Sequence, residues 1–438
     1  MKLSPPVNEN YCATVVRVRA INELANCDNV VGVPLFGMQA ITGKDTAIGD
    51  LVVLFPTETQ LSDEYCAKNN LFRHTEFNDN LEKKGYMEDN RRVKAMKFRG
   101  HTSNALVMSV DSLSYTGIAP SDLKEGDQFD KLGEHEVCKK YQIAIKHGRN
   151  SNQTRKIDQR VDGKFMPEQF DITNFLRVVD NVDQNAMCVT TQKLHGANFR
   201  VANTQVRLPK TWLDRARSLL GFRVTNRVRY DMVYGSHHVI KDANNPNQRH
   251  FYDFDLWSEV GHRFDGLLPK DYILWGEIVG WAGEKPIQRH YTYNQVAGTK
   301  EVYIYRVAIV NMDGVVADLS WDAVKEFCNN LGIKHVPELM RMSVGQLTSA
   351  ASQYGTVLDE FMDIKYYDCP QKEYFADKPI PLAEDSPCDE GICIRIEGLQ
   401  PQIYKVKSPL FLEHESKDLD TGESDIESAD AILVEDLL

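Results

Sequence analysis

Short apolar runs separated by turn residues fill the first 140 residues of the chain. Residues 13–20 alternate apolar and polar positions with a period of two, whereas residues 50–55 and 105–110 are continuous apolar runs. Alternation over such lengths predicts half-buried strands, and a short continuous run between turns predicts a strand buried on both faces. Regularly spaced short strands are typical of a small barrel or sandwich. We therefore predict a β domain over residues 1–140.

Basic side chains cluster with a phenylalanine inside this region. The stretch 91–99 holds five Lys or Arg residues, with Phe98 among them. An aromatic and basic strand face is typical of a small barrel that binds nucleic acid. A solvated edge strand carries the same charges, and the pattern alone does not choose between the two.

The rest of the chain mixes the two periodicities. Residues 141–165 are polar and basic and predict a linker. Residues 166–412 predict a mixed domain, with residues 335–385 as a helical insertion. Strands are expected at 187–191, 272–280, 302–311, 392–397 and 403–406, and helices at 211–220, 320–331 and 343–363.

Charge is distributed unevenly over the 438 residues. The net charge is −12, but residues 413–438 hold ten Asp or Glu against one Lys, which is −9 and leaves −3 for the body. Such an acidic segment predicts a disordered tail. Residues 139–160 and 207–229 each hold seven Lys or Arg against one Asp. A local excess of this kind suits a polyanion, although a solvated surface would look the same.

Composition narrows the class of protein. No apolar run approaches the roughly 20 residues of a membrane helix, and the first ten residues lack the apolar core of a secretory signal. Nine cysteines without a Cys-x-x-Cys pair disfavour zinc ribbons and a secreted disulfide framework. We expect a protein of a reducing, intracellular compartment that neither enters a membrane nor is secreted.

A lysine directly after a strand is the first chemical feature. Lys193 follows the β-type run 186–191, and Gly196 comes three residues later. Burial at a strand end disfavours the charged amine and so makes it a nucleophile, while glycine lets backbone approach a ligand closely. A lysine at such a place is also commonly a surface residue with a buried stem.

Four later segments add to this lysine. Glu277 stands in an apolar strand, Glu390 precedes another, two lysines at positions 405 and 407 share one strand face, and two tyrosines occupy the strand 302–305. A nucleoside triphosphate needs cations for its phosphates, carboxylates for hydroxyls or Mg²⁺, and an aromatic for its base. Each residue taken singly has a structural explanation as well.

The order of these motifs resembles the covalent nucleotidyltransferases, which comprise DNA ligases, RNA ligases and capping enzymes. The order is Lys-x-His-Gly-x-Asn, Gly-Glu-x-x-Gly, an aromatic strand, Glu-Gly-Ile and Lys-x-Lys. His195 and Asn198 make the first motif similar to that of RNA ligases. The β-rich start, the segment 166–173 and the mere 31 residues after position 407 resemble the RNA ligases with an N-terminal OB domain known from Deinococcus and Naegleria.

This resemblance implies an α+β fold class. An N-terminal OB-like β-barrel would precede an adenylyltransferase (ATP-grasp-like ligase) domain of antiparallel sheets with flanking helices. It also implies ATP as a substrate, Mg²⁺ or Mn²⁺ as cofactor, RNA or an RNA-containing duplex as partner, and a monomer.

The resemblance implies three transfers that begin at Lys193. The amine attacks the α-phosphate of ATP and forms lysyl-AMP, the AMP passes to a 5′-phosphate end, and a 3′-hydroxyl attacks that end and releases AMP. Lys405 and Lys407 are the other implied catalytic residues and contact the α-phosphate, and Lys405 helps to keep Lys193 deprotonated. Each transfer builds charge on phosphate oxygens.

Nucleotide-binding residues follow from the same resemblance. Glu277 is expected to hold the ribose hydroxyls, and Gln192 is a candidate adenine contact, partly through its backbone. Tyr303 or Tyr305 is expected to stack on the base.

Metal and polynucleotide contacts are implied as well. Glu390, Glu277 and His195 are the expected metal ligands, with His195 alternatively a packed neighbour of the glycine. Asn198 and Ser236 are expected at the polynucleotide end.

Three features depart from the pattern or stand outside it. His237 follows Gly-Ser where the family often has an arginine, and Ala308 stands where an acidic residue is common. Cys388 and Cys393, close to Glu390, are interpreted as structural residues.

Other functions remain open at this stage. A DNA ligase or capping-type nucleotidyltransferase is one alternative, and a non-catalytic OB nucleic-acid-binding protein is the other. The physiological end, whether a nick, a broken single strand or an RNA-primed DNA end, does not follow from the sequence.

Overall fold

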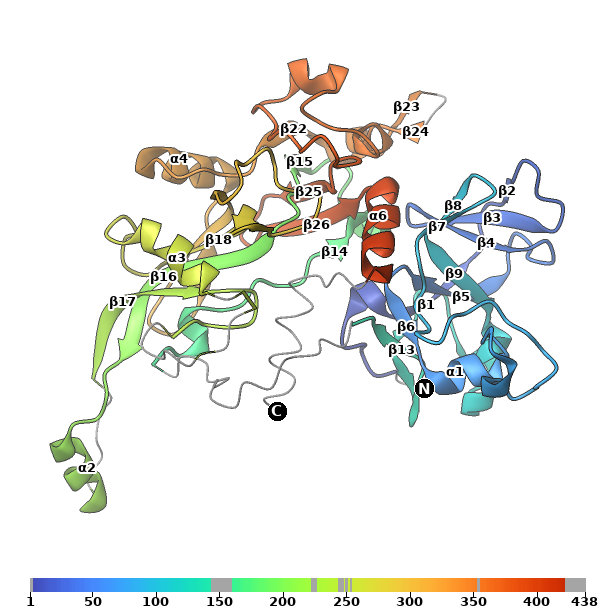
Figure 1. Cartoon of the computed structure of the whole chain (residues 1–438), viewed down its shortest axis with the longest axis horizontal. Coiled ribbons are helices and arrows are strands. Elements are labelled where there is room, and N and C mark those ends of the chain that lie inside the picture. The colour runs from blue at the N-terminus through green and yellow to red at the C-terminus, as the bar shows by residue number, and fades with distance from the viewer. Residues whose placement is uncertain are drawn as a thin grey trace. The chain divides into compact units, whose positions relative to one another are not determined.

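The computed structural model of the chain describes residues 3–142, 160–221, 227–242, 248, 251–252, 254–352 and 355–421. The chain divides into two compact units (Figure 1). The N-terminal unit comprises residues 1–143, 173–181 and 406–423, and the second unit comprises 144–172, 182–405 and 424–438. Most of the predicted linker 141–165 lies outside the described residues.

The N-terminal unit is built on one seven-stranded sheet. The strand order is β10-β1-β5-β9-β4-β3-β2, and all neighbours are antiparallel except β4 and β9. The OB-like barrel remains a prediction. The unit's strands are β1 (Ala13–Arg17), β2 (Asn22–Glu23), β3 (Val30–Leu35), β4 (Met38–Gly43), β5 (Leu51–Pro56), β6 (Thr59–Leu61), β7 (Met96–Phe98), β8 (His101–Ser103), β9 (Ala105–Ser109), β10 (Gln128–Phe129), β11 (Lys131–Leu132), β12 (His135–Glu136), β13 (Cys138–Lys140) and β14 (Thr173–Asn174).

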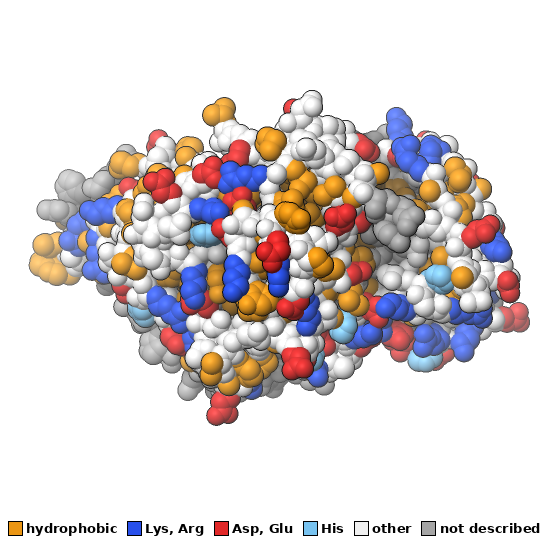
Figure 2. Space-filling view, turned by 90° about the horizontal axis from the view of Figure 1, so that it is seen from above, with side chains coloured by type: hydrophobic (Ala, Val, Ile, Leu, Met, Phe, Trp, Pro, Cys, Tyr) orange, Lys and Arg blue, Asp and Glu red, His pale blue; other side chains and the backbone are white. Residues whose placement is uncertain are grey.

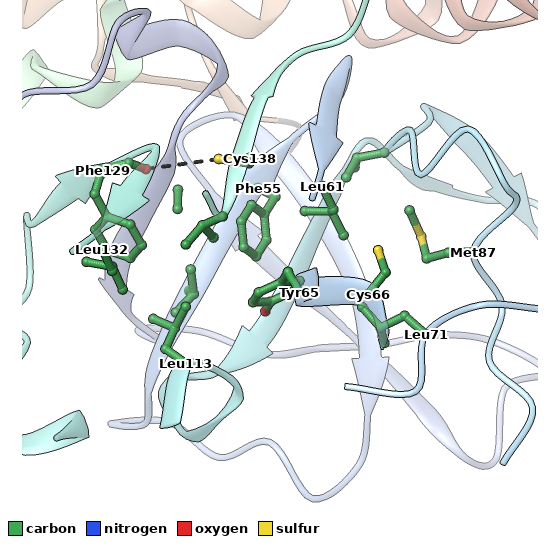
Figure 3. Packing of buried hydrophobic residues seen from close by; sticks show 14 of the residues in the cluster. Phe55, Leu61, Tyr65, Cys66, Leu71, Met87, Leu113, Phe129, Leu132 and Cys138 are labelled. Atoms are coloured by element: carbon green, nitrogen blue, oxygen red, sulfur yellow. Dashed lines mark hydrogen bonds between the residues drawn. The ribbon is translucent and has the colours of Figure 1, made fainter. Parts of the chain in front are cut away.

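Strand β5 explains why its sequence reads as a continuous apolar run. It lies between β1 and β9, and every residue from Val52 to Pro56 is buried. Phe55 packs edge-on against Tyr65 of helix α1 (Asp63–Lys68), with ring centroids 5.3 Å apart (Figure 3). Both faces of the sheet therefore bury apolar side chains.

The basic stretch 91–99 is neutralised by acidic residues instead of forming one exposed strand. Only Met96–Phe98 is a strand, β7. The guanidinium of Arg92 is fully buried and contacts Glu58, Asp420 and the carbonyl of Ser416. Arg92 and Lys94 therefore pair with acidic side chains, and whether the exposed strand Met96–Phe98 contacts nucleic acid stays a prediction.

The acidic partners come partly from a helix that the sequence did not predict. Helix α6 (Pro409–Asp420) overlaps the tail expected to be disordered from residue 413, so that prediction is wrong over residues 413–420. Glu413 Oε2 lies 3.4 Å from Lys97 Nζ, and Asp420 Oδ1 lies 2.8 Å from Lys94 Nζ. These cations offset the repulsion between the acidic side chains. The predicted tail beyond residue 421 lies outside the described residues.

The second unit contains two antiparallel sheets. One has the order β26-β25-β15-β22, with the last two residues of β26 assigned to the other unit, and the second has the order β17-β16-β18-β20-β21, with β19 beside β18. Its strands are β15 (Met187–Gln192), β16 (Ala197–Arg207), β17 (Val228–Gly235), β18 (Tyr272–Ala282), β19 (Lys285–Pro286), β20 (Lys300–Val310), β21 (Val316–Asp318), β22 (Glu338–Ser343), β23 (Ala350–Ser352), β24 (Gly355–Thr356), β25 (Gly391–Ile396) and β26 (Gln402–Lys407). The five predicted strands of this region are confirmed. Mixed α and β structure with antiparallel sheets is likewise as predicted.

Helices flank these sheets. They are α2 (Trp212–Leu219), α3 (Leu256–Gly261), α4 (Trp321–Leu331) and α5 (Val344–Leu347). The prediction for 320–331 is confirmed, since Ser320 caps α4 and Gly332 ends it with a left-handed backbone. Helix α2 lies at the far end of the β16–β17 ribbon (Figure 1), and its neighbour Leu220 is 74% exposed.

The predicted helix over 343–363 is wrong after its first turn. Ser343 and Gln346 form a capping box, but α5 ends at Leu347 and a short hairpin of β23 and β24 follows. The predicted insertion 335–385 is therefore not helical. Instead, β22 pairs with β15, the strand that leads to Lys193.

Candidate active site

The turn 193–196 connects the two sheets of the second unit, because it follows β15 and precedes β16. Its backbone is fixed on both sides: the amide of His195 donates to the Tyr293 hydroxyl at 2.7 Å, and the amide of Gly196 donates to Glu277 Oε1 at 3.0 Å. Gln288 Nε2 donates to the Gly196 carbonyl at 2.9 Å. A Cβ at position 196 would lie 2.2 Å from the Ile278 carbonyl oxygen, so only glycine fits.

Lys193 forms an ion pair with Glu390. Its Nζ lies 2.8 Å from Glu390 Oε2, and its backbone amide donates to the Gly391 carbonyl at 3.0 Å. The carboxylate side chain is only 1% exposed, whereas the lysine side chain is 21% exposed. A buried carboxylate is costly unless it is paired, so the lysine offsets the charge of Glu390 while its own side chain stays accessible to a ligand.

Four of the sequence-predicted residues act electrostatically on one thiol. Cys393 is half-buried on β25, opposite Thr191 of β15. Burial raises the pKa of this thiol to about 11; Lys193 and Lys405 act to lower it, and Glu390 and Glu277 act to raise it. All four charges are therefore close enough to act on the same sulfur atom. The interpretation of Cys393 as a structural residue stays a prediction.

A β-bulge shapes the second sheet beside Glu277. Glu277 pairs in register with Asn198 on one side and Tyr303 on the other. The register shifts next to it, so that Trp275 faces Arg306 and Gly276 faces Ile304, which leaves Tyr305 as the extra residue. The Tyr305 hydroxyl accepts a hydrogen bond from Asn198 Nδ2 at 2.8 Å. The two predicted aromatic residues and Asn198 thus lie beside Glu277.

Gln192 and Asp389 form a buried hydrogen-bonded pair next to Lys193 and Glu390 in the sequence. The Gln192 amide is almost completely buried; it donates to Asp389 Oδ1 at 2.7 Å and exchanges hydrogen bonds with the backbone of Ile380. Asp389 also accepts from the Tyr366 amide at 2.8 Å. Burial raises the pKa of Asp389 to about 7, although these hydrogen bonds act to lower it. The Gln192 side chain therefore bonds to the protein itself.

Two further predicted residues are placed differently. Ser236 is buried inside a tight turn, where its hydroxyl accepts from the Val239 amide at 3.2 Å. Lys407 belongs to the N-terminal unit, where its Nζ lies 3.2 Å from Glu415 Oε1 and 5.0 Å from the Phe411 ring centroid.

The loop 287–295 supplies residues that the sequence did not reveal. Besides Gln288 and Tyr293, it carries Tyr291, which packs edge-on against His195 with centroids 5.1 Å apart. Its left-handed residues include His290 and Asn294. Asparagine and histidine tolerate that backbone better than most residues, but nothing in the local pattern ties the loop to position 196.

The donor set at Glu390 fits a divalent cation. His195 Nδ1 lies 3.9 Å from Glu390 Oε2, close enough for both groups to approach one ion. Carboxylate oxygens suit Mg²⁺ and Mn²⁺, and imidazole is tolerated by the latter.

The face of the molecule viewed in Figure 2 carries mixed charge. Figure 2 shows basic side chains lying among acidic and apolar ones on the face that it views, without one continuous basic surface. Arg215 and Arg217 of the basic segment 207–229 are on α2, where their side chains lie outside the described residues. No helix among the described residues combines the length and the apolar character that crossing a bilayer requires.

Comparison with known proteins gives two findings. The chain is similar in fold to the Naegleria gruberi RNA ligase with PPi, at a TM-score of 0.58 and 14% identity over 94% of this chain and 100% of that one. A mutant of the same ligase with ATP and Mn matches at a TM-score of 0.59 and 15% identity, over 93% of this chain and 99% of that one. No curated protein sequence matches the chain.

A family model assigns the chain more directly. The model described as RNA ligase matches residues 187–407, which begin at β15 and end at Lys407. This range contains Lys193, Glu277 and Glu390, three of the residues that the motif order singled out. The chain belongs to the RNA ligase family.

Proposed function

We propose that this RNA ligase is ATP-dependent and works through a lysyl-AMP intermediate on Lys193. The observation that carries the proposal is the ion pair between Lys193 Nζ and Glu390 Oε2 at 2.8 Å, beside a turn whose Gly196 amide donates to Glu277 Oε1 at 3.0 Å. Transfer of a nucleotide to lysine needs an accessible amine, cations for phosphate oxygens and carboxylates for hydroxyls or metal. The matched Naegleria structures with ATP, AMP and Mn support the choice of nucleotide and cation.

Lys193 is in an unreactive arrangement in the geometry described above. An opposite charge at 2.8 Å favours the ammonium form, whereas attack on phosphorus requires the neutral amine. The ion pair between Lys193 and Glu390 therefore has to weaken before the amine can lose its proton and react. Lys405, which acts on the same Cys393 thiol, opposes a second positive charge at Lys193 and offers a cation to the α-phosphate.

Bound Mg²⁺ or Mn²⁺ would neutralise phosphate charge during the transfers. Glu390 and His195 would hold the ion, with Glu277 as the third candidate. The same ligation would weaken the attraction between Glu390 and the Lys193 ammonium, which links nucleotide binding to activation of the lysine.

The nucleoside would lie along β18 and β20. Glu277 would bind the ribose hydroxyls, and its Oε1 already accepts a hydrogen bond from the Gly196 amide next to the nucleophile turn. Tyr303 or Tyr305 would stack on adenine. Lys407, two residues beyond Lys405 on β26, would add a phosphate contact after leaving Glu415. Gln192 would contact adenine through its backbone, since its side-chain amide is engaged inside the protein.

Polynucleotide ends would meet the side of the site where Asn198 lies. Asn198 is oriented by Tyr305 and also accepts a hydrogen bond at its carbonyl from Trp257 Nε1 at 2.9 Å. Ser236 would contact the end through its turn. The N-terminal OB-like unit would bind the adjoining strand, and the joined end would carry a ribose on the 3′-hydroxyl side.

A sealing assay tests this proposal. The full chain is given ATP, Mg²⁺ or Mn²⁺ and 5′-phosphorylated nicks whose 3′-hydroxyl strand ends in ribose or in deoxyribose. We expect an adenylylated 5′-end intermediate and faster sealing of the ribose end, with GTP giving neither product. Sealing that ignores the 3′ sugar would contradict the RNA preference. Absence of both products would favour the non-catalytic alternative.

A further inference from the structure

A second cluster of ligand-type side chains lies in the same unit, outside the residues assigned above to nucleotide chemistry. His237 and His238 occupy the turn between β17 and Ile240, and Glu168 belongs to the segment before β14. One nitrogen of each imidazole and one carboxylate oxygen of Glu168 lie within 4.8 Å of one another. Within the described part of the chain, this is the group of three His, Cys, Asp or Glu residues that meets this spacing.

A buried arginine holds both segments that supply these side chains. Arg200 is 1% exposed. Its Nε donates to the Ser236 carbonyl and its Nη1 donates to the Met166 carbonyl, each at 2.8 Å. The residue before His237 and the residue two before Glu168 are therefore tied to one guanidinium. Rigid support of this kind keeps ligands in place before an ion arrives.

The two imidazoles are oriented as well as positioned. Their rings stack with centroids 4.1 Å apart and an interplanar angle of 8°. His237 Nε2 donates to the Gln169 carbonyl at 3.0 Å, which leaves Nδ1 of the neutral ring with a lone pair. Gln169 is in turn held by Arg306 Nη1 at 3.0 Å from its side-chain oxygen. A backbone carbonyl behind a ring nitrogen is the usual outer support of a metal-binding histidine.

Glu168 completes the donor set. Its Oε2 lies 2.9 Å from His238 Nδ1. A carboxylate oxygen is a ligand that zinc-class ions accept beside imidazole nitrogens. The Glu168 side chain is 51% exposed, so an ion can enter from solvent.

We propose that Glu168, His237 and His238 form a binding site for a zinc-class transition metal ion. Two imidazoles and one carboxylate are a known zinc ligand set that leaves the fourth position for water. Zinc ligands lie about 2.0–2.2 Å from the ion, so small side-chain rotations suffice to bring atoms within 4.8 Å onto one ion. Mg²⁺ prefers oxygen ligands, which separates this site from the one at Glu390. The ion would tie the 166–169 segment to the β17 turn.

Metal titration of the full chain tests this site without any nucleotide. Protein freed of metal with a chelator is titrated with Co²⁺, whose visible absorption reports tetrahedral ligation, and then with Zn²⁺ as competitor. We expect one equivalent of Co²⁺ to bind and one equivalent of Zn²⁺ to displace it. In Glu168→Gln, which keeps a hydrogen-bond acceptor for His238, affinity should fall by more than the roughly 10–100-fold that loss of an outer support costs. His237→Ala/His238→Ala should abolish binding.

Two controls make the result specific. His135 and Glu64 form an exposed pair at 3.0 Å in the N-terminal unit, so His135→Ala should bind metal as the unaltered chain does. Glu390→Gln should keep the tetrahedral Co²⁺ signal, which separates this site from the cation site proposed at Glu390. Sub-stoichiometric binding by the unaltered chain would reduce the cluster to a hydrogen-bonded contact. Full binding by both the Glu168→Gln and double-alanine variants would overturn the proposal too.

Discussion

Two buried glutamates, one in each unit, meet a basic side chain in opposite ways. In the N-terminal unit, Glu58 Oε2 lies 3.1 Å from Arg92, whose side chain is completely buried. In the second unit, Glu390 Oε2 lies 2.8 Å from Lys193, whose side chain is 21% exposed. Both carboxylates need a cation to offset burial, but only the second cation can reach a ligand.

The difference shows how the same chemistry serves structure or function. The Nη2 of Arg92 also donates to Asp420 and to the Ser416 carbonyl, so this nitrogen holds α6. Its planar fork suits several fixed acceptors at once. Lysine presents a compact ammonium that can lose its proton and act as a nucleophile. An arginine therefore suits the fully buried pair with Glu58, which we call the closed pair. A lysine suits the partly exposed pair with Glu390, which we call the open pair.

The largest effect is expected at Lys193. Lys193→Ala should lower self-adenylation at least about 10³-fold, because a lost nucleophile is not replaced by its neighbours. Its thermal midpoint should stay within about 2 °C of the unaltered chain, since the pair is partly exposed. Self-adenylation is measured as label transferred from α-labelled ATP to the denatured chain. The thermal midpoint is measured by a thermal melt. Lys193→Arg keeps the charge and should be equally inactive; activity in this variant would contradict nucleophilic attack by the lysine.

Arg92 should show the reverse pattern. Arg92→Ala leaves Glu58 buried without its main cation, which should lower the free energy of unfolding by about 3–5 kcal/mol. Arg92→Lys should recover only part of this loss, because one ammonium cannot replace the fork. Denaturant unfolding measures the change. Self-adenylation per folded molecule should be unaltered, and a specific loss of activity would show that the closed pair is not purely structural.

Asp389 is a third buried carboxylate and extends the comparison, because amide groups of Gln192 and Tyr366 donate hydrogen bonds to it where the two glutamates have a cation. Asp389 has a pKa of about 7 in the folded chain against an ordinary 3.8. Between these values the folded state holds a proton that the unfolded state has lost, so stability falls as pH rises from about 4 to 7, by at most about 4 kcal/mol. Asp389→Asn should flatten this dependence.

The comparison is read from unfolding midpoints at several pH values. The Asp389→Asn variant loses one hydrogen bond, so the slope with pH and not the absolute stability is the diagnostic quantity. Asp313→Asn, a substitution at an exposed turn, should keep the slope of the unaltered chain. Equal slopes in all three proteins would mean that Asp389 is ionised in the folded state at low pH.

The smallest effect is expected at Tyr305. Tyr305→Phe removes the hydroxyl that accepts from Asn198 Nδ2, worth about 0.5–1.5 kcal/mol. Sealing should slow by roughly 2- to 10-fold while self-adenylation is retained, as measured by single-turnover assays of each step. Tyr230→Phe removes a hydroxyl bonded to Asp271 and serves as the matched control. Equal slowing of both steps would place Asn198 at the nucleotide instead of the polynucleotide end.

The sequence predicted well what depends on neighbouring residues. The strands that carry Glu277 and Lys405, and the strand that follows Glu390, are visible because period-two patterns and apolar runs are local. The capped helix 320–331 was likewise set by residues within its own length.

Features that depend on distant contacts escaped prediction. Helix α6 is acidic, and its pairing with Arg92, more than 300 residues earlier, could not be inferred from composition. The bulge at Tyr305 requires the register of a neighbouring strand. The segment after Ser343 has a helix start, but β-pairing of Glu338–Ser343 with β15 fixes its surroundings. Local signals thus predicted the strands around the candidate site, whereas tertiary contacts decided how those strands are supported.

Peptide mapping of the adenylated chain tests the central claim most directly. The full chain is incubated with ATP and Mg²⁺, digested under conditions that preserve a phosphoramidate, and analysed by mass spectrometry. The open ion pair predicts AMP on the peptide that contains Lys193 and on neither the Lys405 nor the Lys407 peptide. AMP on another lysine, or no AMP from a chain that had not been isolated already adenylated, would contradict it.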